Sequence, residues 1–446
     1  MDERLLREIQ KSNPWWFNKK ESLPPYKRKV FSYLLKYLES KQIIAIVGLR
    51  RVGKTILMKQ LIDSTQPSTN QENILFFTFE EKWGISDVLE DVLYYYLENI
   101  AKSKRKFIFL DEIQKVNGWE ETLKRFYDRD SDIKFIVSGS ASLQISKSIE
   151  SLAGRIFDVY VPPLSFREFL ELNDVTVNIK DTALTYHDYS LLYQNNLYQK
   201  EKLTALFSEY IFKGGFPELA RETNDELIRK YITNSVIDRI LIKDIPEEFS
   251  VKNIRALRGI VEYAARETSG LLVLDSLATT LGVNKETVSN YVEYLKKAFI
   301  LHIIYNYTMS IGKQLRTSKK LHLTLPSIAI ALESYDRDVL LHPEIIGKYI
   351  ESLVAVFLIY RYKRIFFWRT PQKDEVDIIV EEKQPLPIEV KYKSQVSDAD
   401  CKAVVKYCVK FDVKRGIVVT KDTLETRTFN GTMVELIPAW VILLGI

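Results

Sequence analysis

The stretch IIAIVGLRRVGKTILM, residues 43–58, decides the fold of the first part of this chain. Its opening residues, Ile43 to Val47, form a short apolar run that is typical of a buried parallel strand. The run stops at Gly48, and Gly48 to Thr55 fits the pattern GxxxxGK(S/T) at every fixed position. An amphipathic stretch, Thr55 to Ile62, follows it. The sequence therefore predicts a strand, a glycine-framed loop and a helix.

Each fixed residue of this loop suits the binding of a triphosphate. Gly48 and Gly53 let the backbone turn its N–H groups toward phosphate oxygens, where a side chain would intrude. Lys54 would place its charge on the β- and γ-phosphates, and the Thr55 hydroxyl would complete the shell of a Mg²⁺ ion. The alternative is a chance match in an ordinary strand–turn–helix, but the flanking strand and helix favour nucleotide binding. We therefore expect a nucleotide bound with Mg²⁺ at this loop.

Length and composition limit the remaining possibilities. A chain of 446 residues is too long for one ordinary core, so we expect several domains. The net charge of +5 is small and favours no partner by itself, so any basic surface must be local. The longest apolar runs are far shorter than the roughly 18 residues that a membrane helix needs, and the charged N-terminus is unlike a signal peptide. Two cysteines and four scattered histidines provide neither a disulfide framework nor zinc-ligand spacing. These features predict a cytoplasmic protein without membrane contact.

Further strands alternate with helical stretches, which predicts a parallel α/β sheet. One strand-like run, from Lys106, ends in the acidic pair Asp111-Glu112. At this place in P-loop NTPases, the first carboxylate holds the magnesium and the next can orient the attacking water. We therefore expect Asp111 to be the metal partner and Glu112 to be the catalytic base.

The next strand, Ile133 to Val137, leads into a serine-rich turn. A polar side chain there could contact the γ-phosphate or position the water, which makes Ser138 and Ser140 candidates. A helix N-cap at Ser140 or Ser142 is an equally good explanation, and both can hold. Arg155 starts the following strand, where an arginine finger reaching the nucleotide of an adjacent subunit would lie. The finger implies a homo-oligomer, and the alternative is a solvated surface arginine.

At this point the chain resembles a known family. Residues 43 to 170 are similar to AAA+ ATPases, and more narrowly to the predicted archaeal and bacterial ATPases that pair this core with a nuclease-like C-terminal domain. The motifs that carry the narrower resemblance are NPWW at Asn13, GLRRVGKT at Gly48, FLDEIQ at Phe109, SGSAS at Ser138, SLAGR at Ser151, PLSFREF at Pro163 and GGFPEL at Gly214. The resemblance implies Mg²⁺-dependent ATP hydrolysis, with the family's positions matched by Lys54, Thr55, Asp111, Glu112 and Arg155. Arg50 and Arg51 also match, and Arg51 joins the nucleotide-binding candidates.

A helix-turn-helix is expected within Val273 to Tyr307. A first helix is stopped by Gly282, and Asn284 can cap a second helix, Lys285 to Ala298. A later hairpin could be a wing, and its lysines and arginine suit phosphate contacts. The expected DNA-binding residues are Lys285, Thr287, Ser289 and Asn290 on the second helix, with Lys313, Arg316, Lys319 and Lys320 on the hairpin. Against DNA contact, the second helix also exposes glutamates, and winged helices often serve as protein-binding modules.

The last part of the chain gathers carboxylates on neighbouring strands. Because strand side chains alternate, Glu389 and Lys391 share one face, and Asp377 on the hairpin partner can face the same side. Such a group can hold Mg²⁺ and activate water for phosphodiester cleavage. The arrangement resembles the PD-(D/E)xK nucleases, and Glu351 matches their helical carboxylate. These four residues form the expected second metal site, and the alternative is a retained fold whose site makes only salt bridges.

We therefore predict an α/β protein: a P-loop AAA+ parallel sheet, then a helical and winged-helix region, then an α/β restriction-endonuclease-like domain. The expected divisions are an N-terminal extension (1–25), the AAA+ core (26–172), a linker or insertion (173–200), a helical lid (201–267), a winged helix (268–340) and the nuclease-like domain (341–446). The preferred hypothesis is an ATP-hydrolysing, DNA-processing enzyme. The competing hypothesis is an ATP-dependent switch or regulator with a non-cleaving nuclease-like domain. A third, a protein remodeller, would be stimulated by a polypeptide instead.

Overall fold

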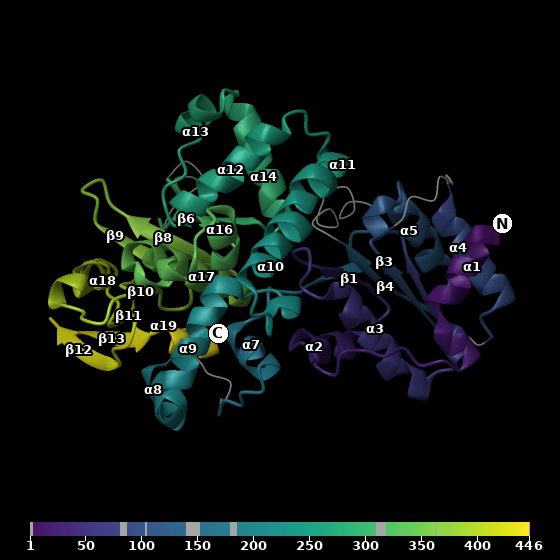
Figure 1. Ribbon diagram of the computed structural model, residues 1–446, viewed down its shortest axis with the longest axis horizontal. Helices are drawn as coiled ribbons and strands as arrows, with labels where there is room; N and C mark the ends of the chain where they lie inside the picture. Colours follow the sequence, from purple (N-terminus) through teal and green to yellow (C-terminus); the bar gives the residue numbers. More distant parts are fainter. Residues whose placement is uncertain are drawn as a thin grey trace. The chain divides into compact units, whose positions relative to one another are not determined.

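The computed structural model describes residues 3–80, 87–102, 105–139, 152–178, 185–308, 318–362 and 364–445. These residues form two compact units, which divide between Pro163 and Leu164 (Figure 1). Each unit has a sheet and helices of its own. Within the described ranges we find no helix with the length and apolar character that a bilayer crossing requires.

In its described residues, the first unit is built on a five-stranded parallel sheet with the order β2-β3-β4-β1-β5. The strands are β1 (Ile43–Val47), β2 (Ile74–Thr78), β3 (Lys106–Asp111), β4 (Ile133–Gly139) and β5 (Ile156–Tyr160). Every residue of β1 and β4 is buried, which explains why these strands read as continuous apolar runs. Because β1 pairs with β4 and β4 with β3, the loop after β1 lies at the same sheet edge as the acidic end of β3.

Helices pack against this sheet through apolar stripes. In α5, the buried residues Trp119, Leu123, Phe126 and Tyr127 recur at helical spacing, so one face turns to the core. The helices of the unit are α1 (Glu3–Ser12), α2 (Val30–Tyr37), α3 (Lys54–Thr65), α4 (Val88–Asn99) and α5 (Trp119–Arg129). Among them, α3 begins directly at the glycine-framed loop, so the helix N-terminus faces the loop.

The second unit opens with helices. The run from α10 to α11 is one continuous helix whose middle has π-helical hydrogen bonding, over Tyr231–Asp238 and Ile240–Asp244 (Figure 1). The helices of this part are α7 (Phe166–Leu172), α8 (Tyr186–Asn195), α9 (Lys200–Lys213), α10 (Asp225–Lys230), α11 (Ile245–Phe249), α12 (Ile254–Glu267), α13 (Leu274–Leu281), α14 (Lys285–Lys297) and α16 (Pro326–Leu332).

The turn between α13 and α14 has the caps that the sequence predicts. Gly282 ends α13 with a positive φ of 64°, which suits a residue without a side chain. The side chain of Asn284 then accepts a hydrogen bond from the Thr287 N–H at 2.7 Å and starts α14. Leu277 and Val288 are buried, as expected of two packed helices.

A mixed sheet follows, in the order β12-β13-β11-β10-β9-β8-β6-β7 over the described residues. Its strands are β6 (Leu301–Asn306), β7 (Lys319–Leu323), β8 (Ile365–Arg369), β9 (Glu375–Val380), β10 (Leu386–Val390), β11 (Arg415–Thr420), β12 (Glu425–Phe429) and β13 (Thr432–Pro438). The helices that accompany it are α17 (Pro343–Arg361), α18 (Asp398–Phe411) and α19 (Ala439–Gly445). The predicted α/β fold class is confirmed: a parallel sheet, then a helical region, then a domain with a mixed sheet.

The pair of β6 and β7 continues this mixed sheet, and the expected wing near Lys313 to Lys320 lies mostly outside the described residues. β6 pairs in parallel with β8 through Tyr305 and Phe366. The predicted division at residue 340 therefore falls between strands of one sheet. This join brings β7 close to α17, which determines the surroundings of Lys320.

Candidate functional sites

The glycine-framed loop of the first unit has the tight backbone that phosphate binding requires. A Cβ at Gly48 would lie 2.4 Å from the carbonyl oxygen of Val161, so a side chain cannot fit there. Gly53 caps α3 with a φ of 96°, and Arg51 takes a φ of 67°. The loop thus turns twice through conformations that favour glycine before α3 begins. Its following helix directs N–H groups and a partial positive charge toward the loop.

Lys54 lies across the mouth of this loop. Its ammonium donates to the carbonyl oxygens of Gly48 and Leu49, both at 3.0 Å, and the residue is buried. The side chain is therefore held over the loop, close to the N–H groups at the start of α3. A lysine in that position supplies a point charge to phosphate oxygens.

Thr55 and Asp111 are joined directly at the edge of the sheet. The Thr55 hydroxyl donates to Asp111 Oδ2 at 2.8 Å, and Ser138 donates to the other carboxylate oxygen. Burial and the neighbouring Glu112 raise the pKa of Asp111. The hydrogen bonds from the two hydroxyls and the charge of Lys54 act in the opposite direction and lower it. A hydroxyl and a carboxylate side by side are oxygen ligands that suit Mg²⁺. These residues, with the cradle at Gly48, fit a nucleotide bound with magnesium.

The expected catalytic side chains occupy different settings. Glu112 follows Asp111 with a φ of 54°, and its carboxylate accepts a hydrogen bond from the side chain of Gln114. Ser138 is fully buried against Asp111, so in this structure it orients that carboxylate. Ser140 lies outside the described residues. The roles assigned to Glu112 and the serines stay predictions.

Arg155 forms a bidentate ion pair with Asp128 at the surface of the first unit. Its Nε and Nη2 donate to the two oxygens of Asp128 at 2.9 and 3.1 Å, and its side chain is 31% exposed. The pair raises the pKa of Arg155 and lowers that of Asp128. The guanidinium is accessible to a neighbouring molecule, and its role as a finger stays a prediction.

Sequence reasoning missed Arg28, whose side chain supports the glycine-framed loop through hydrogen bonds to backbone carbonyls. Its guanidinium is buried and donates to the carbonyl oxygen of Val52 at 2.7 Å and to that of Pro162 at 2.9 Å. Arg28 thus ties the glycine-framed loop to the chain that leaves β5. Because the second contact spans more than a hundred residues, nothing local in the sequence could have indicated it.

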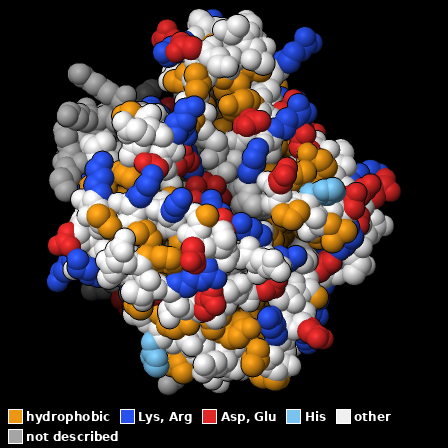
Figure 2. Space-filling model, turned by 90° about the vertical axis from the view of Figure 1, so that its left-hand side faces the viewer, with side chains coloured by type: hydrophobic (Ala, Val, Ile, Leu, Met, Phe, Trp, Pro, Cys, Tyr) orange, Lys and Arg blue, Asp and Glu red, His pale blue; other side chains and the backbone are white. Residues whose placement is uncertain are grey.

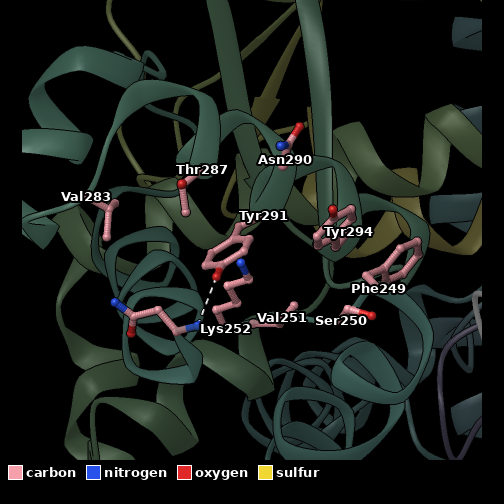
Figure 3. Close-up of a pocket in the computed structure, with 10 residues that line it drawn as sticks. Phe249, Ser250, Val251, Lys252, Val283, Thr287, Asn290, Tyr291 and Tyr294 are labelled. Atoms are coloured by element: carbon pink, nitrogen blue, oxygen red, sulfur yellow. Dashed lines mark hydrogen bonds between the residues drawn. The ribbon is translucent and has the colours of Figure 1, made fainter.

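In the second unit, the outward face of α14 borders a shallow pocket of about 270 Å³ (Figure 3). Thr287 and Asn290, two of the expected DNA-binding residues, line it beside the segment Phe249 to Asn253. The backbone N–H of Asn253 donates to the Tyr291 hydroxyl at 3.1 Å, which fixes this segment against the helix. Phe249 and Tyr294 stack with ring centroids 4.1 Å apart.

The other expected DNA-binding residues are spread over different surroundings. Lys285 is exposed and pairs with Asp275 at 2.8 Å, and Ser289 is half-buried. Lys319 lies over the Tyr305 ring, whereas Lys313 and Arg316 lie outside the described residues. Figure 2 shows a face of the molecule on which basic and acidic side chains are interspersed. On that face, no single basic stripe stands out among the described residues.

Lys320 differs most from its expected place. As a DNA-binding residue it would lie at the surface, but its side chain is only 2% exposed. Its ammonium contacts Glu351 Oε1 at 2.9 Å, Asp377 Oδ1 at 3.1 Å and Glu375 Oε1 at 2.7 Å. The physical reason is the sheet: β7 continues it, so Lys320 points under α17 and not outward. This position corrects the expectation of a phosphate contact.

The structure brings together the four residues of the expected second metal site. Asp377 Oδ2 accepts a hydrogen bond from Val390 N–H at 2.9 Å, and Glu389 Oε2 accepts one from Asp377 N–H at 3.3 Å. Lys391 donates to Glu389 Oε1 at 2.6 Å. We call Glu351, Glu375, Asp377, Glu389, Lys320 and Lys391 the acidic cluster.

Burial controls the charges of this cluster. Burial and Asp377 raise the pKa of Glu351 to about 7, in spite of Lys320. Burial and Asp377 likewise raise the pKa of Glu389 to about 8, in spite of Lys391. Burial acts to lower the pKa of the Lys320 ammonium. The three carboxylates around it nevertheless hold that pKa well above its ordinary value.

The described residues contain no group of three or more acidic, histidine or cysteine side chains arranged to hold a metal ion. Oε1 of Glu351 and both carboxylate oxygens of Asp377 and Glu389 already accept hydrogen bonds from lysines or backbone N–H groups. The cluster therefore does not fit the magnesium site expected at Glu351, Asp377, Glu389 and Lys391.

Three regions of the chain match families of known protein domains. Residues 40–170 match an AAA domain family. The first unit has a P-loop AAA+ fold. Residues 204–339 and 346–442 match two domains of unknown function, DUF8612 and DUF4143. The AAA domain contains the glycine-framed loop, Asp111 and Arg155, whereas Lys320 and the rest of the acidic cluster fall in two different matched regions.

Relatives with similar sequences come from an archaeon and a bacterium. The chain is 28% identical to the uncharacterized protein MJ1637 of Methanocaldococcus jannaschii, over 86% of this chain and 82% of that protein. It is 27% identical to MJ1544 of the same organism, over 60% of this chain and 57% of the relative, so it spans little more than half of that relative's length. An uncharacterized protein of Haemophilus influenzae is 28% identical over 64% of this chain and 68% of its own length.

Among solved structures, Aeropyrum pernix ORC1 in complex with DNA matches with a TM-score of 0.32 and 11% identity, covering 72% of this chain and 96% of that one. AMPPCP-bound DnaA from Aquifex aeolicus matches with a TM-score of 0.25 and 14% identity, and the match covers 62% of this chain and 90% of that one.

Proposed function

We propose that this chain is a Mg²⁺-dependent ATPase that binds DNA and couples nucleotide hydrolysis to that binding. The observation that carries the ATPase is the hydrogen bond between Thr55 and Asp111, formed beside a loop over which Lys54 is held. Three functional groups from α3 and β3 converge there, at the edge of a buried sheet.

The roles follow from the chemistry of each group. Lys54 and the N–H groups at the start of α3 would hold the phosphates, and the Thr55–Asp111 pair would hold the magnesium. Bound magnesium would spread the charge that develops on the transferred phosphoryl group. Glu112, next to Asp111, would orient the attacking water. Arg28 would position the loop without touching the nucleotide.

DNA binding rests on the second unit. The capped pair α13 and α14 has the connection of a helix-turn-helix, and α14 presents Thr287 and Asn290 on an accessible face beside a pocket. Lys285, at the start of the same helix, is exposed and could exchange Asp275 for a phosphate. The proposed DNA contact is therefore made by α14 and not by β7.

Turnover measurements test both halves of this proposal. ATP hydrolysis with Mg²⁺ is compared for the wild type, Lys54→Ala and Asp111→Asn, without DNA and with linear, forked or four-way DNA. The control is Lys59→Ala, because Lys59 lies on the same helix and pairs with Glu21 instead. We expect Lys54→Ala and Asp111→Asn to lose about 100-fold or more in turnover, Lys59→Ala to keep it, and DNA to stimulate the wild type. If ATP does not bind, the whole proposal fails; if DNA neither binds nor changes turnover, its DNA half fails.

The second candidate is an ATP-dependent switch whose nuclease-like domain does not cleave. The acidic cluster favours it, because the central carboxylates contact a buried lysine. Such a switch would hydrolyse ATP slowly and retain its nucleotide, whereas a motor would turn over continuously on DNA. Single-turnover hydrolysis and the rate of nucleotide release distinguish these two behaviours.

A further inference from the structure

The buried ammonium of Lys320 lies at the centre of carboxylates from different elements. Glu351 comes from α17, Glu375 and Asp377 come from β9, and Lys320 itself comes from β7. The three contacts lie between 2.7 and 3.1 Å, which is the range of charge-assisted hydrogen bonds and close ion pairs.

The number of contacts matches the chemistry of an ammonium group. A protonated lysine carries three N–H donors, and here a separate carboxylate lies within reach of each. Mg²⁺ instead demands near-octahedral oxygens at about 2.0–2.1 Å and keeps several waters. A side chain with 2% exposure, surrounded by its partners, leaves little room for such a shell.

The other oxygens of the two strand carboxylates are also engaged. Val390 N–H donates to Asp377 Oδ2, while Glu389 receives hydrogen bonds from Asp377 N–H and Lys391 Nζ. A divalent cation that bound Asp377 and Glu389 would therefore have to displace donors that the fold itself supplies. Each of those donors would then lose its partner inside the protein.

We infer that the Lys320 ammonium takes the place of a divalent cation in this nuclease-like domain. The lysine joins α17 to β9 by charge, as a metal would join them, and the domain cleaves no phosphodiester bond. The inference concerns the second unit alone, so it does not depend on the ATPase proposed above.

The position of Lys320 along the chain explains why a motif cannot reveal it. The carboxylates and Lys391 fall within residues 346–442, which match one domain of unknown function, whereas Lys320 falls within residues 204–339, which match another. The lysine is therefore supplied to the cluster from a separately matched region.

Manganese binding and thermal unfolding test the inference. Mn²⁺ is titrated into nucleotide-free full-length protein and followed by electron paramagnetic resonance, for the wild type and Asp377→Asn. We expect the two proteins to bind Mn²⁺ alike, because the cluster takes no cation. A wild-type site that Asp377→Asn removes, or DNA cleavage with Mg²⁺ or Mn²⁺ that Asp377→Asn abolishes, would overturn the inference.

Substitution of Lys320 gives a second test, in which the protein should gain a Mn²⁺ site. Lys320→Met should lower the melting temperature by several degrees and create a Mn²⁺ site, and added Mn²⁺ should restore part of the lost melting temperature. The double variant Lys320→Met/Asp377→Asn should lose that rescue. The matched control is Lys319→Met, because Lys319 is the neighbouring residue and lies over the Tyr305 ring, outside the cluster. A folded Lys320→Met variant without a new Mn²⁺ site contradicts the inference; if that variant does not fold, the comparison of wild type with Asp377→Asn decides alone.

Discussion

The side-chain amide of Asn13 pairs with both backbone polar groups of Phe76. Asn13 Nδ2 donates to the Phe76 carbonyl at 2.9 Å, and Asn13 Oδ1 accepts from the Phe76 N–H at 2.7 Å. Phe76 lies in β2, which is an edge strand of the parallel sheet. The amide thus imitates a neighbouring strand, and the indoles of Trp15 and Trp16 complete the cover by donating to Ile74 O. The Asn-Pro-Trp-Trp motif therefore protects an edge that would otherwise be open to another chain.

This relationship predicts that Asn13→Ala destabilises the first unit. The change leaves the N–H and carbonyl of Phe76 unpaired, and each buried unpaired group costs about 1–3 kcal/mol, so we expect a loss of about 2–6 kcal/mol in unfolding free energy. Denaturant unfolding followed by tryptophan fluorescence measures it. The control is Asn99→Ala, because Asn99 is exposed at the end of α4 and its amide donates to the nearby Tyr95 carbonyl. Equal stability of the two variants would contradict the assigned role.

The contacts of Arg28 predict that it affects nucleotide affinity although it does not touch the nucleotide. Arg28→Met removes the hydrogen bonds to Val52 and Pro162, so the glycine-framed loop loses its support and must be ordered by the ligand. We expect ATP to bind about tenfold more weakly, which corresponds to about 1.4 kcal/mol. Fluorescent-nucleotide titration gives the affinity. The control is Lys27→Met, the exposed neighbour, which should bind like wild type; an unchanged affinity of Arg28→Met would exclude the positioning role.

Substitutions in the ion pair of Arg155 and Asp128 can distinguish an arginine finger from a surface contact. If Arg155 acts on the nucleotide of an adjacent subunit, Arg155→Ala lowers turnover about 1,000-fold in the assembled protein, while Asp128→Ala leaves turnover intact because it frees the guanidinium. If the pair is only structural, both variants behave alike. Mixing Arg155→Ala with Lys54→Ala protein gives a further readout, because active sites with both groups can form between subunits only if the arginine acts in trans. Recovery of turnover on mixing is the expected result.

How far the sequence could predict this structure depends on the distance over which each feature is built. The glycine-framed loop and the caps at Gly282 and Asn284 are local, so residue type and spacing revealed them. Lys320 contacts Asp377 across 57 positions of the chain. From sequence it belonged to a basic hairpin, and only the pairing of β6 with β8 turns it inward. The sequence thus predicted Glu351, Asp377, Glu389 and Lys391 of the acidic cluster, but it did not place Glu375 or Lys320 there.

The same limit applies to Arg28 and Asn13. Arg28 reaches Pro162 across 134 positions, and Asn13 reaches Phe76 across 63. In the sequence, the Asn13 motif stood out as part of a family resemblance, and nothing in it indicated which strand it would cover. Contacts to backbone atoms leave no matching side chain in the sequence, so their partners cannot be inferred from residue types.

The histidines on β6 and β7 predict a loss of stability in acid. Burial and Lys296 lower the pKa of His302 to about 4, and its ring shares a hydrogen bond with the Tyr360 hydroxyl at 2.9 Å. His322, directly opposite in the sheet, has a pKa well below its ordinary value because of burial and Lys320. Above about pH 8 both rings are neutral whether the chain is folded or unfolded, so their protonation has no effect on stability there. Below that pH, the unfolded chain binds protons that the folded chain does not bind. The free energy of unfolding therefore falls as the pH drops toward 4.

For His302 the shift from 6.5 to about 4 corresponds to about 3 kcal/mol when complete. His302→Phe removes the proton-binding group from both states, so the fall in unfolding free energy between pH 6.5 and 4 should be smaller than in wild type. The measurement is denaturant unfolding at a series of pH values, and His187→Phe, at an exposed position, should keep the wild-type slope. Parallel curves for wild type and His302→Phe would mean that the half-buried His302 ring does not carry this acid sensitivity, and the remaining slope would then belong to His322 and the carboxylates.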